Sequence, residues 1–142
     1  MTRALIDTNI ILDALASREP FRADAENICM LAAEEKIQCF VTANSATDIY
    51  YLVRKNTSEA TARDALRNLF HLFSVADVTG EDCTAALDSS VGEYEDALVA
   101  VCAARLGVDC IVTRDQDFLR AQTVCPVVDP ARFLALVQGR YT

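Results

Sequence analysis

Short apolar runs alternate with helical segments along the whole chain, and this alternation limits the folds that the sequence can adopt. Three of the five expected strands lack the polar alternation of a strand with one face in water. Strands buried on both faces are typical of a parallel sheet with helices packed on each side. The expected strands are 4–6, 37–41, 74–78, 109–113 and 124–128, and the expected helices are 9–16, 21–35, about 42–55, 57–73, 79–87, 94–106, a short one from 115, and 130–137.

We therefore expect one α/β domain over residues 1–142, with a short parallel sheet flanked by helices in three layers. The composition fits this expectation, because 142 residues at 52% hydrophobic content can fill a substantial core. No stretch approaches the ~20 apolar residues that a membrane span needs. The N-terminus carries no signal-peptide pattern, so we expect a cytoplasmic protein without a membrane association.

Cysteine spacing and charge exclude further classes of protein. The six cysteines form no C-x-x-C pair, and His71 has no partner at ligand spacing, which argues against a zinc site or a disulfide framework. The net charge of −8, from 13 basic and 21 acidic residues, argues against a protein that coats nucleic acid through bulk charge. It leaves room for an enzyme that binds nucleic acid through a local patch and a metal ion.

Four carboxylates lie where strands end or the following helices begin. Asp7 ends the first expected strand, and Asp115 follows the fourth. Asp48 and Asp96 lie in helices that are otherwise nearly all apolar. Because ligands bind outside the carboxyl ends of the strands in such sheets, we expect these four side chains to converge at one edge.

Each of these acids also has a purely structural explanation. Asp7 and Asp115 could cap helix N-termini, Asp96 could complement a helix dipole, and Asp48 could lie on a solvated helix face. Taken together, four like charges at one edge repel each other unless a cation lies between them. Mg²⁺ and Mn²⁺ prefer hard oxygen ligands, so the sequence predicts a site for one or two such ions.

Four segments, in this order, carry a resemblance to a known family. They are Leu5-Ile6-Asp7-Thr8-Asn9, Asp48 in the helix after the second strand, Glu95-Asp96-Ala97-Leu98-Val99-Ala100, and Ile111-Val112-Thr113-Arg114-Asp115-Gln116-Asp117-Phe118. The set resembles the PIN domain family, and most of all the VapC-type toxin ribonucleases of bacterial toxin–antitoxin pairs. The resemblance covers essentially the whole chain.

The resemblance implies Mg²⁺- or Mn²⁺-dependent cleavage of single-stranded or structured RNA by a homodimer, with a cognate antitoxin as a possible partner. One departure concerns the second acid, which is often Glu in the family; the shorter Asp48 could reach the metal only through water. The resemblance makes Asp7, Asp48, Asp96 and Asp115 the catalytic and metal-site acids, makes Thr8, Asn9 and Thr113 supporting hydrogen-bonding groups, and makes Asp117 and Glu95 less favoured members of the site.

Other functions and residue roles stay open from the sequence. A non-catalytic binding module could keep the same fold. A phosphoryl-transfer protein of the haloacid-dehalogenase or receiver type would want a D-x-D after the first strand, and Asp7-Thr8-Asn9 lacks the second Asp. We expect Asp13 to face water. The remaining open residues could hold RNA phosphates or bases, or else form solvated faces and core: Arg54, Lys55, Arg63, Arg67, Tyr50 and Tyr51.

Overall fold

The computed structural model describes residues 1–141, and over these residues it contains one five-stranded sheet with the strand order β3-β2-β1-β4-β5. All neighbouring strands are parallel. The strands are β1 (Thr2–Ile6), β2 (Ile37–Thr42), β3 (Phe73–Ala76), β4 (Cys110–Val112) and β5 (Val127–Val128). This arrangement confirms the expected α/β fold with a short parallel sheet.

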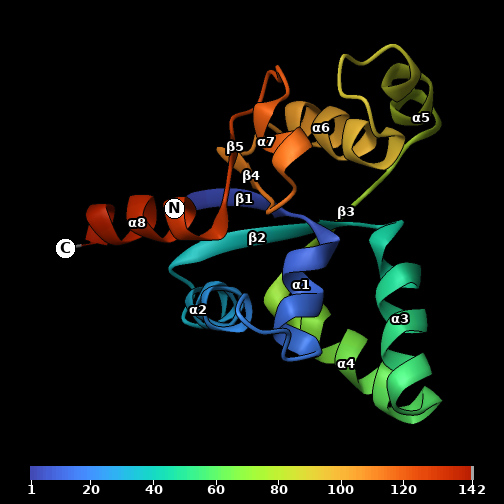
Figure 1. The fold of residues 1–142 in the computed structure, drawn as a ribbon, viewed down its shortest axis with the longest axis vertical. Helices are drawn as coiled ribbons and strands as arrows, with labels where there is room; N and C mark the ends of the chain where they lie inside the picture. The colour runs from blue at the N-terminus through green and yellow to red at the C-terminus, as the bar shows by residue number, and fades with distance from the viewer. Residues whose placement is uncertain (142) are drawn as a thin grey trace.

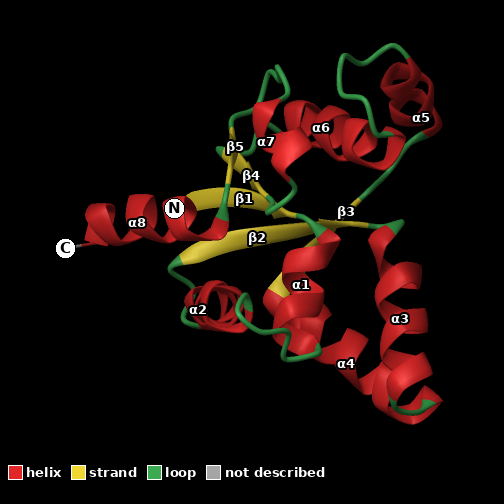
Figure 2. Ribbon diagram, viewed as in Figure 1, coloured by secondary structure: helices red, strands yellow, loops and turns green. Residues whose placement is uncertain are grey.

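Helices cover both faces of the sheet, as Figures 1 and 2 show. The residues that pack on one face come mainly from α1 (Thr8–Leu15), α2 (Arg22–Ala33), α3 (Ser45–Asn56), α4 (Glu59–Leu72) and α8 (Pro130–Tyr141). Those on the other face come from α5 (Gly80–Leu87), α6 (Tyr94–Leu106) and α7 (Gln116–Arg120). None of the helices in the described residues is long and apolar enough to cross a membrane.

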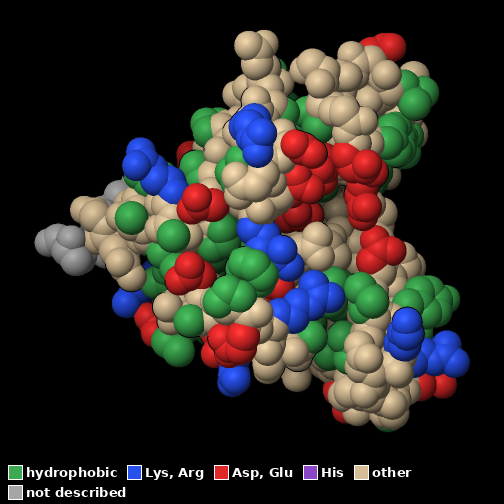
Figure 3. Space-filling view, viewed as in Figure 1, with side chains coloured by type: hydrophobic (Ala, Val, Ile, Leu, Met, Phe, Trp, Pro, Cys, Tyr) green, Lys and Arg blue, Asp and Glu red, His purple; other side chains and the backbone are tan. Residues whose placement is uncertain are grey.

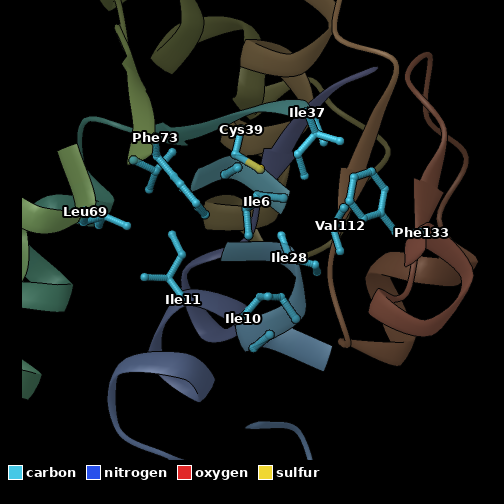
Figure 4. Packing of buried hydrophobic residues seen from close by; sticks show 14 of the residues in the cluster. Ile6, Ile10, Ile11, Ile28, Ile37, Cys39, Leu69, Phe73, Val112 and Phe133 are labelled. Atoms are coloured by element: carbon cyan, nitrogen blue, oxygen red, sulfur yellow. The ribbon is translucent and has the colours of Figure 1, made fainter. Parts of the chain in front are cut away.

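Strand geometry explains why the apolar runs of the sequence lack polar alternation. Successive side chains of a strand point to opposite faces of the sheet. In β1, Ala4 and Ile6 pack with α1 and α2, whereas Leu5 packs with α6 on the opposite face. Figure 4 shows Ile6 among the buried residues of the first of these two clusters. Both faces are therefore apolar, and every residue of the run has to be apolar as well.

The strand order places a topological switch point at β1. From β1 the chain moves outward through β2 to β3, and it returns to pair β4 with the other side of β1. In sheets of this kind a ligand site forms outside the carboxyl ends of the strands at such a point. Asp7 follows β1, and Asp115 follows β4 three residues after Val112, so both acids lie beside this switch point.

The last strand is shorter than the sequence predicts. A strand was expected over 124–128, but the structure pairs only Val127 and Val128 with β4. Pro126 has no backbone N–H to give to a ladder, and Val124 is 91% exposed. Val124 is therefore an apolar residue that lies outside the sheet and is exposed to water.

Candidate functional site

A cavity of about 540 Å³ lies at the carboxyl edge of the sheet, between α1, α3 and the start of α6. All four acids expected at this edge line it, and so do Thr8, Asn9 and Glu95. Figure 3 shows Asp and Glu side chains gathered in the hollow between α6 above and α1 and α3 below. The carboxylates that line the cavity are Asp7, Asp48, Glu93, Glu95, Asp96 and Asp115.

Asp7 occupies the N-cap position of α1, but its side chain makes no capping hydrogen bond. The Asp7 backbone N–H donates to the carbonyl of Val112 (2.9 Å), which ties the residue to the end of β4. Its carboxylate oxygen Oδ2 instead accepts a hydrogen bond from the buried Thr113 hydroxyl (2.8 Å). Burial raises the pKa of Asp7, and the Thr113 hydrogen bond opposes that shift.

Asp115 does cap a helix while it lines the cavity. Its Oδ1 atom accepts from the backbone N–H groups of Asp117 (2.9 Å) and Phe118 (3.1 Å) at the start of α7. Its own backbone N–H donates to the hydroxyl oxygen of Thr113 (3.2 Å). Thr113 thus contacts both Asp7 and Asp115, and it fixes the position of the two residues relative to each other.

Asp96 lies in the first turn of α6, where negative charges surround it. Burial, followed by the charges of Asp7 and Asp115, raises the pKa of Asp96 to about 7. Burial also raises the pKa of Glu95, and a hydrogen bond with Asp48 and its charge add to this effect. Burial and neighbouring negative charges in the cavity therefore favour the protonated forms of Asp96 and Glu95.

A second cavity of about 400 Å³ adjoins the first and shares Glu93, Asp96 and Asp115 with it. Asp117 lines this second cavity together with Val91, Gly92 and Phe118. Asp117 is absent from the lining of the first cavity. The less favoured acid of the closing motif therefore lies beside the main group of acids and not within it.

Three hydroxyl groups position the start of α3, and sequence reasoning missed two of them. The Thr8 hydroxyl donates to Ser45 Oγ (2.7 Å), and Ser45 Oγ lies 2.8 Å from Thr42 Oγ1. Ser45 and Thr42 are both buried. This chain of hydroxyls links the first turns of α1 and α3, and so it sets the place from which Asp48 projects. The only signal in the sequence is a Thr and a Ser three positions apart where a strand ends.

Asp13 does not face water, so that expectation was wrong. Its side chain is completely buried and accepts two hydrogen bonds from Arg114, at 2.8 and 3.1 Å. Arg18 lies 3.8 Å away, and the Arg114 guanidinium stacks over the Phe21 ring at 4.0 Å. The buried neighbours Ile10, Ile11 and Leu12 in the same helix were the signal that this position lies inside the protein.

The donor set fits a hard divalent cation. The groups that line the first cavity offer carboxylate and hydroxyl oxygens, and no His or Cys lines it. Within residues 1–141, no three His, Cys, Asp or Glu side chains meet as a ready metal-binding group. After burial, repulsion by Asp7 and Asp115 is the next cause of the raised pKa of Asp96, and a bound cation would remove this repulsion. Asp7, Asp96 and Asp115, whose charges act on one another, could hold such a cation.

Comparison with known proteins gives the family. The sequence model of the PIN domain matches residues 3–117. The chain belongs to the PIN domain family. The family expected from the sequence motifs is therefore confirmed, and no curated protein matches the sequence of this PIN domain protein.

Three solved structures share the fold of this PIN domain protein. VapBC2 from Rickettsia felis, bound to a fragment of promoter DNA, has a TM-score of 0.66 at 15% identity and covers 90% of this chain and 98% of its own. A toxin–antitoxin complex from Klebsiella pneumoniae has a TM-score of 0.66 at 21% identity, and the match covers 89% of this chain and 97% of the matched chain. VapC20 from Mycobacterium tuberculosis, a toxin that cleaves the sarcin–ricin loop, has a TM-score of 0.64 at 16% identity, with 81% and 92% covered.

Proposed function

We propose that this PIN domain protein is a Mg²⁺- or Mn²⁺-dependent endoribonuclease and the toxin of a toxin–antitoxin pair. The observation that carries the proposal is the meeting of Asp7, Asp96 and Asp115, from three separate segments of the chain, at one cavity beside the topological switch point. Membership of the PIN domain family and the fold shared with VapC toxins support the same function.

The proposed chemistry assigns a role to each residue of the site. Asp7, Asp96 and Asp115 would hold a divalent ion, which when bound would lower the pKa of the attacking water and neutralise charge on the phosphodiester. Thr113 orients Asp7 through its hydroxyl donor and Asp115 through its hydroxyl acceptor. Asp48, which lines the same cavity and whose charge acts on Glu95, contributes through water. No Lys, His or Cys lines the cavity, and in the proposed reaction the attacking nucleophile is a water molecule.

Cleavage of RNA tests the proposal directly. Purified protein incubated with total RNA is expected to produce new ends in Mn²⁺ or Mg²⁺ and none in EDTA. Asp7→Asn removes a proposed metal ligand. It should therefore lower the cleavage activity by more than the roughly 10–100-fold that follows the loss of a residue supporting a ligand. Asp117→Asn should cost much less, because Asp117 does not line the first cavity. Asp88→Asn changes an exposed acid outside both cavities and serves as the matched control.

Two outcomes of this experiment would contradict the proposal. Equal cleavage by the wild type and Asp7→Asn would identify a contaminating nuclease. Metal binding without cleavage in any RNA pool would favour a non-catalytic binding module instead.

The proposed partners are a cognate antitoxin and a second copy of this chain. Co-expression with the protein of the neighbouring open reading frame should yield a stable complex and suppress cleavage. Light scattering of the purified chain should give the mass of a dimer. A chain that stays monomeric, or a neighbour that neither binds nor inhibits, would remove the corresponding partner from the proposal.

A further inference from the structure

One face of α3 leads away from the acidic cavity and changes character along its length. Asp48 begins this face, Tyr51 and Leu52 follow at the next turn, and Lys55 follows one turn later, which is the spacing of residues that share a helix face. Asp48, Tyr51 and Leu52 line the cavity. Figure 3 shows acidic side chains near the upper end of α3, as Figure 1 places that helix, and basic side chains beside its lower end.

Tyr51 is an aromatic ring placed where an RNA base could reach it. Its side chain is 61% exposed although it lines the cavity, so it is not part of the core. The half-buried Tyr50 packs edge-on against it, with ring centroids 5.2 Å apart and an interplanar angle of 79°. Arg63 in turn lies 5.8 Å from the centre of the Tyr50 ring. Tyr51 therefore contacts the Tyr50 ring while most of its own surface stays exposed.

Arg54 and Lys55 supply positive charge beyond this ring. Within the described residues, neither side chain forms an ion pair or a hydrogen bond. Most other basic residues in that part of the chain are engaged, as Arg63 is with Glu59 and Arg67 with Asp64. A protein of net charge −8 whose site is acidic needs such unengaged cations to hold a phosphate backbone. At a rise of about 1.5 Å per residue, Lys55 lies about 10 Å along the axis from Asp48.

We propose that this face of α3 binds the RNA strand next to the cleaved bond, with Tyr51 stacking on an unpaired base and Lys55 contacting a backbone phosphate. The inference rests on the proposed ribonuclease function and adds the residues that select and hold the substrate. Stacking on Tyr51 requires a base that is free of pairing, because a base inside a duplex presents no open face. The occupant of this face is therefore a single strand or a loop of RNA.

Binding without metal tests the proposal separately from cleavage. The probe is a fluorescein-labelled single-stranded RNA of about 12 nucleotides, titrated in EDTA at low salt and followed by anisotropy. Tyr51→Ala should weaken binding about 5- to 100-fold, the usual range for loss of one base stack. Tyr51→Phe keeps the ring and should bind like the wild type. An RNA of the same length that lacks bases should bind equally to the wild type and to Tyr51→Ala, since it has nothing to stack.

Lys55 has its own readout and a matched control. Loss of one phosphate contact should reduce the slope of log affinity against log salt by about 0.7 in Lys55→Ala. The other lysine of the chain, Lys36, pairs with Glu34 (2.9 Å) before the start of β2, at the opposite edge of the sheet. Lys36→Ala should leave the slope unchanged.

Two results would overturn the proposal. One is that Tyr51→Ala binds the RNA probe with wild-type affinity. The other is a change in Tyr51→Ala from dimer to monomer with RNA binding unaffected, which would make this face a protein interface. If the wild type binds the probe through Tyr51 but cleaves no RNA in any metal, the binding face stands and the ribonuclease function fails. If the wild type cleaves RNA and Tyr51→Ala keeps both the affinity and the KM of the wild type, the ribonuclease function stands and the binding face fails.

Discussion

Asp13 and Arg114 form the most deeply buried ion pair of the described chain, with the two side chains 0% and 31% exposed. Removing Arg114 leaves the Asp13 carboxylate buried with only Arg18, 3.8 Å away. Breaking a buried pair from one side usually costs about 3–5 kcal/mol, because the remaining charge is uncompensated. We therefore expect Arg114→Met to lower the free energy of unfolding in urea by about 3 kcal/mol. Arg114 precedes Asp115, so this variant should also lose cleavage activity.

A surface pair provides the control for this prediction. Arg22 and Glu26 lie one turn apart on α2 and are each about half exposed. Exposed pairs contribute little because water screens them. Arg22→Met should therefore leave the urea midpoint nearly unchanged. A similarly small change in Arg114→Met would show that the Asp13 carboxylate is not held by that guanidinium in solution.

Residues were predicted where their place follows from their own strand or helix, and were missed where it depends on a particular distant partner. The place of Asp7 follows from the strand that it ends, because the edge of a parallel sheet collects whatever follows each strand. The Asp13–Arg114 and Thr8–Ser45 contacts join residues 101 and 37 positions apart. No local pattern specifies such partners. The apolar residues next to Asp13 in the sequence could have predicted that Asp13 is buried, but they could not have predicted that its partner is Arg114.

At the scale of elements, α5 and α6 are joined by one carboxylate. Asp82 belongs to the capping box of α5 with Thr79, and it accepts hydrogen bonds from Arg105 of α6 at 2.9 and 3.0 Å. The Arg105 hydrogen bonds are the main reason that the pKa of Asp82 falls to about 2. Between this value and the ordinary 3.8, the unfolded chain binds more protons than the folded one. This contribution to stability is therefore complete above about pH 4 and is lost as the pH falls toward 2.

Melting temperatures measured between pH 2 and pH 5 test this link between the helices. Asp82→Asn should melt lower than the wild type at pH 5, and the difference should shrink toward pH 2. Asp64→Asn removes an exposed pair with Arg67 on α4 and should change little at either pH. A difference between Asp82→Asn and the wild type that is constant across this range would show that Asp82 is not charged against Arg105.

Elements were predicted better than their ends and their order. The spacing of apolar residues located the helices and strands, because an element that is buried on one or two faces has apolar residues at regular positions in the sequence. It could not give the strand order β3-β2-β1-β4-β5, which depends on where each crossover returns. The short β5 was overestimated because Val124 is apolar yet exposed, while Pro126 limits the ladder.

At the scale of the whole molecule, stability and metal binding share one set of charges. The raised pKa of Asp96, about 7, lies above its ordinary 3.8, so the folded protein binds more protons than the unfolded chain between these values. Stability of the metal-free protein should therefore fall as the pH rises from about 4 to about 7, and this penalty is complete above 7. Asp96→Asn removes the repulsion with Asp7 and Asp115 and should stabilise the metal-free protein at pH 8 by about 1–2 kcal/mol after solvent screening.

A divalent ion should reverse the same penalty. Binding to the folded state alone stabilises it by about 2.7 kcal/mol at 100 times the Kd. Thermal unfolding at pH 8 should thus shift upward with Mn²⁺ or Mg²⁺, and the shift should be smaller at pH 5, where protons occupy the site. In Asp96→Asn the metal response should be small at both pH values, because one ligand charge is gone. If Mn²⁺ or Mg²⁺ raised the melting temperature equally in the wild type and in Asp96→Asn, the ion would bind elsewhere. A metal site that includes Asp96 must bind the ion less tightly once the charge of Asp96 is removed.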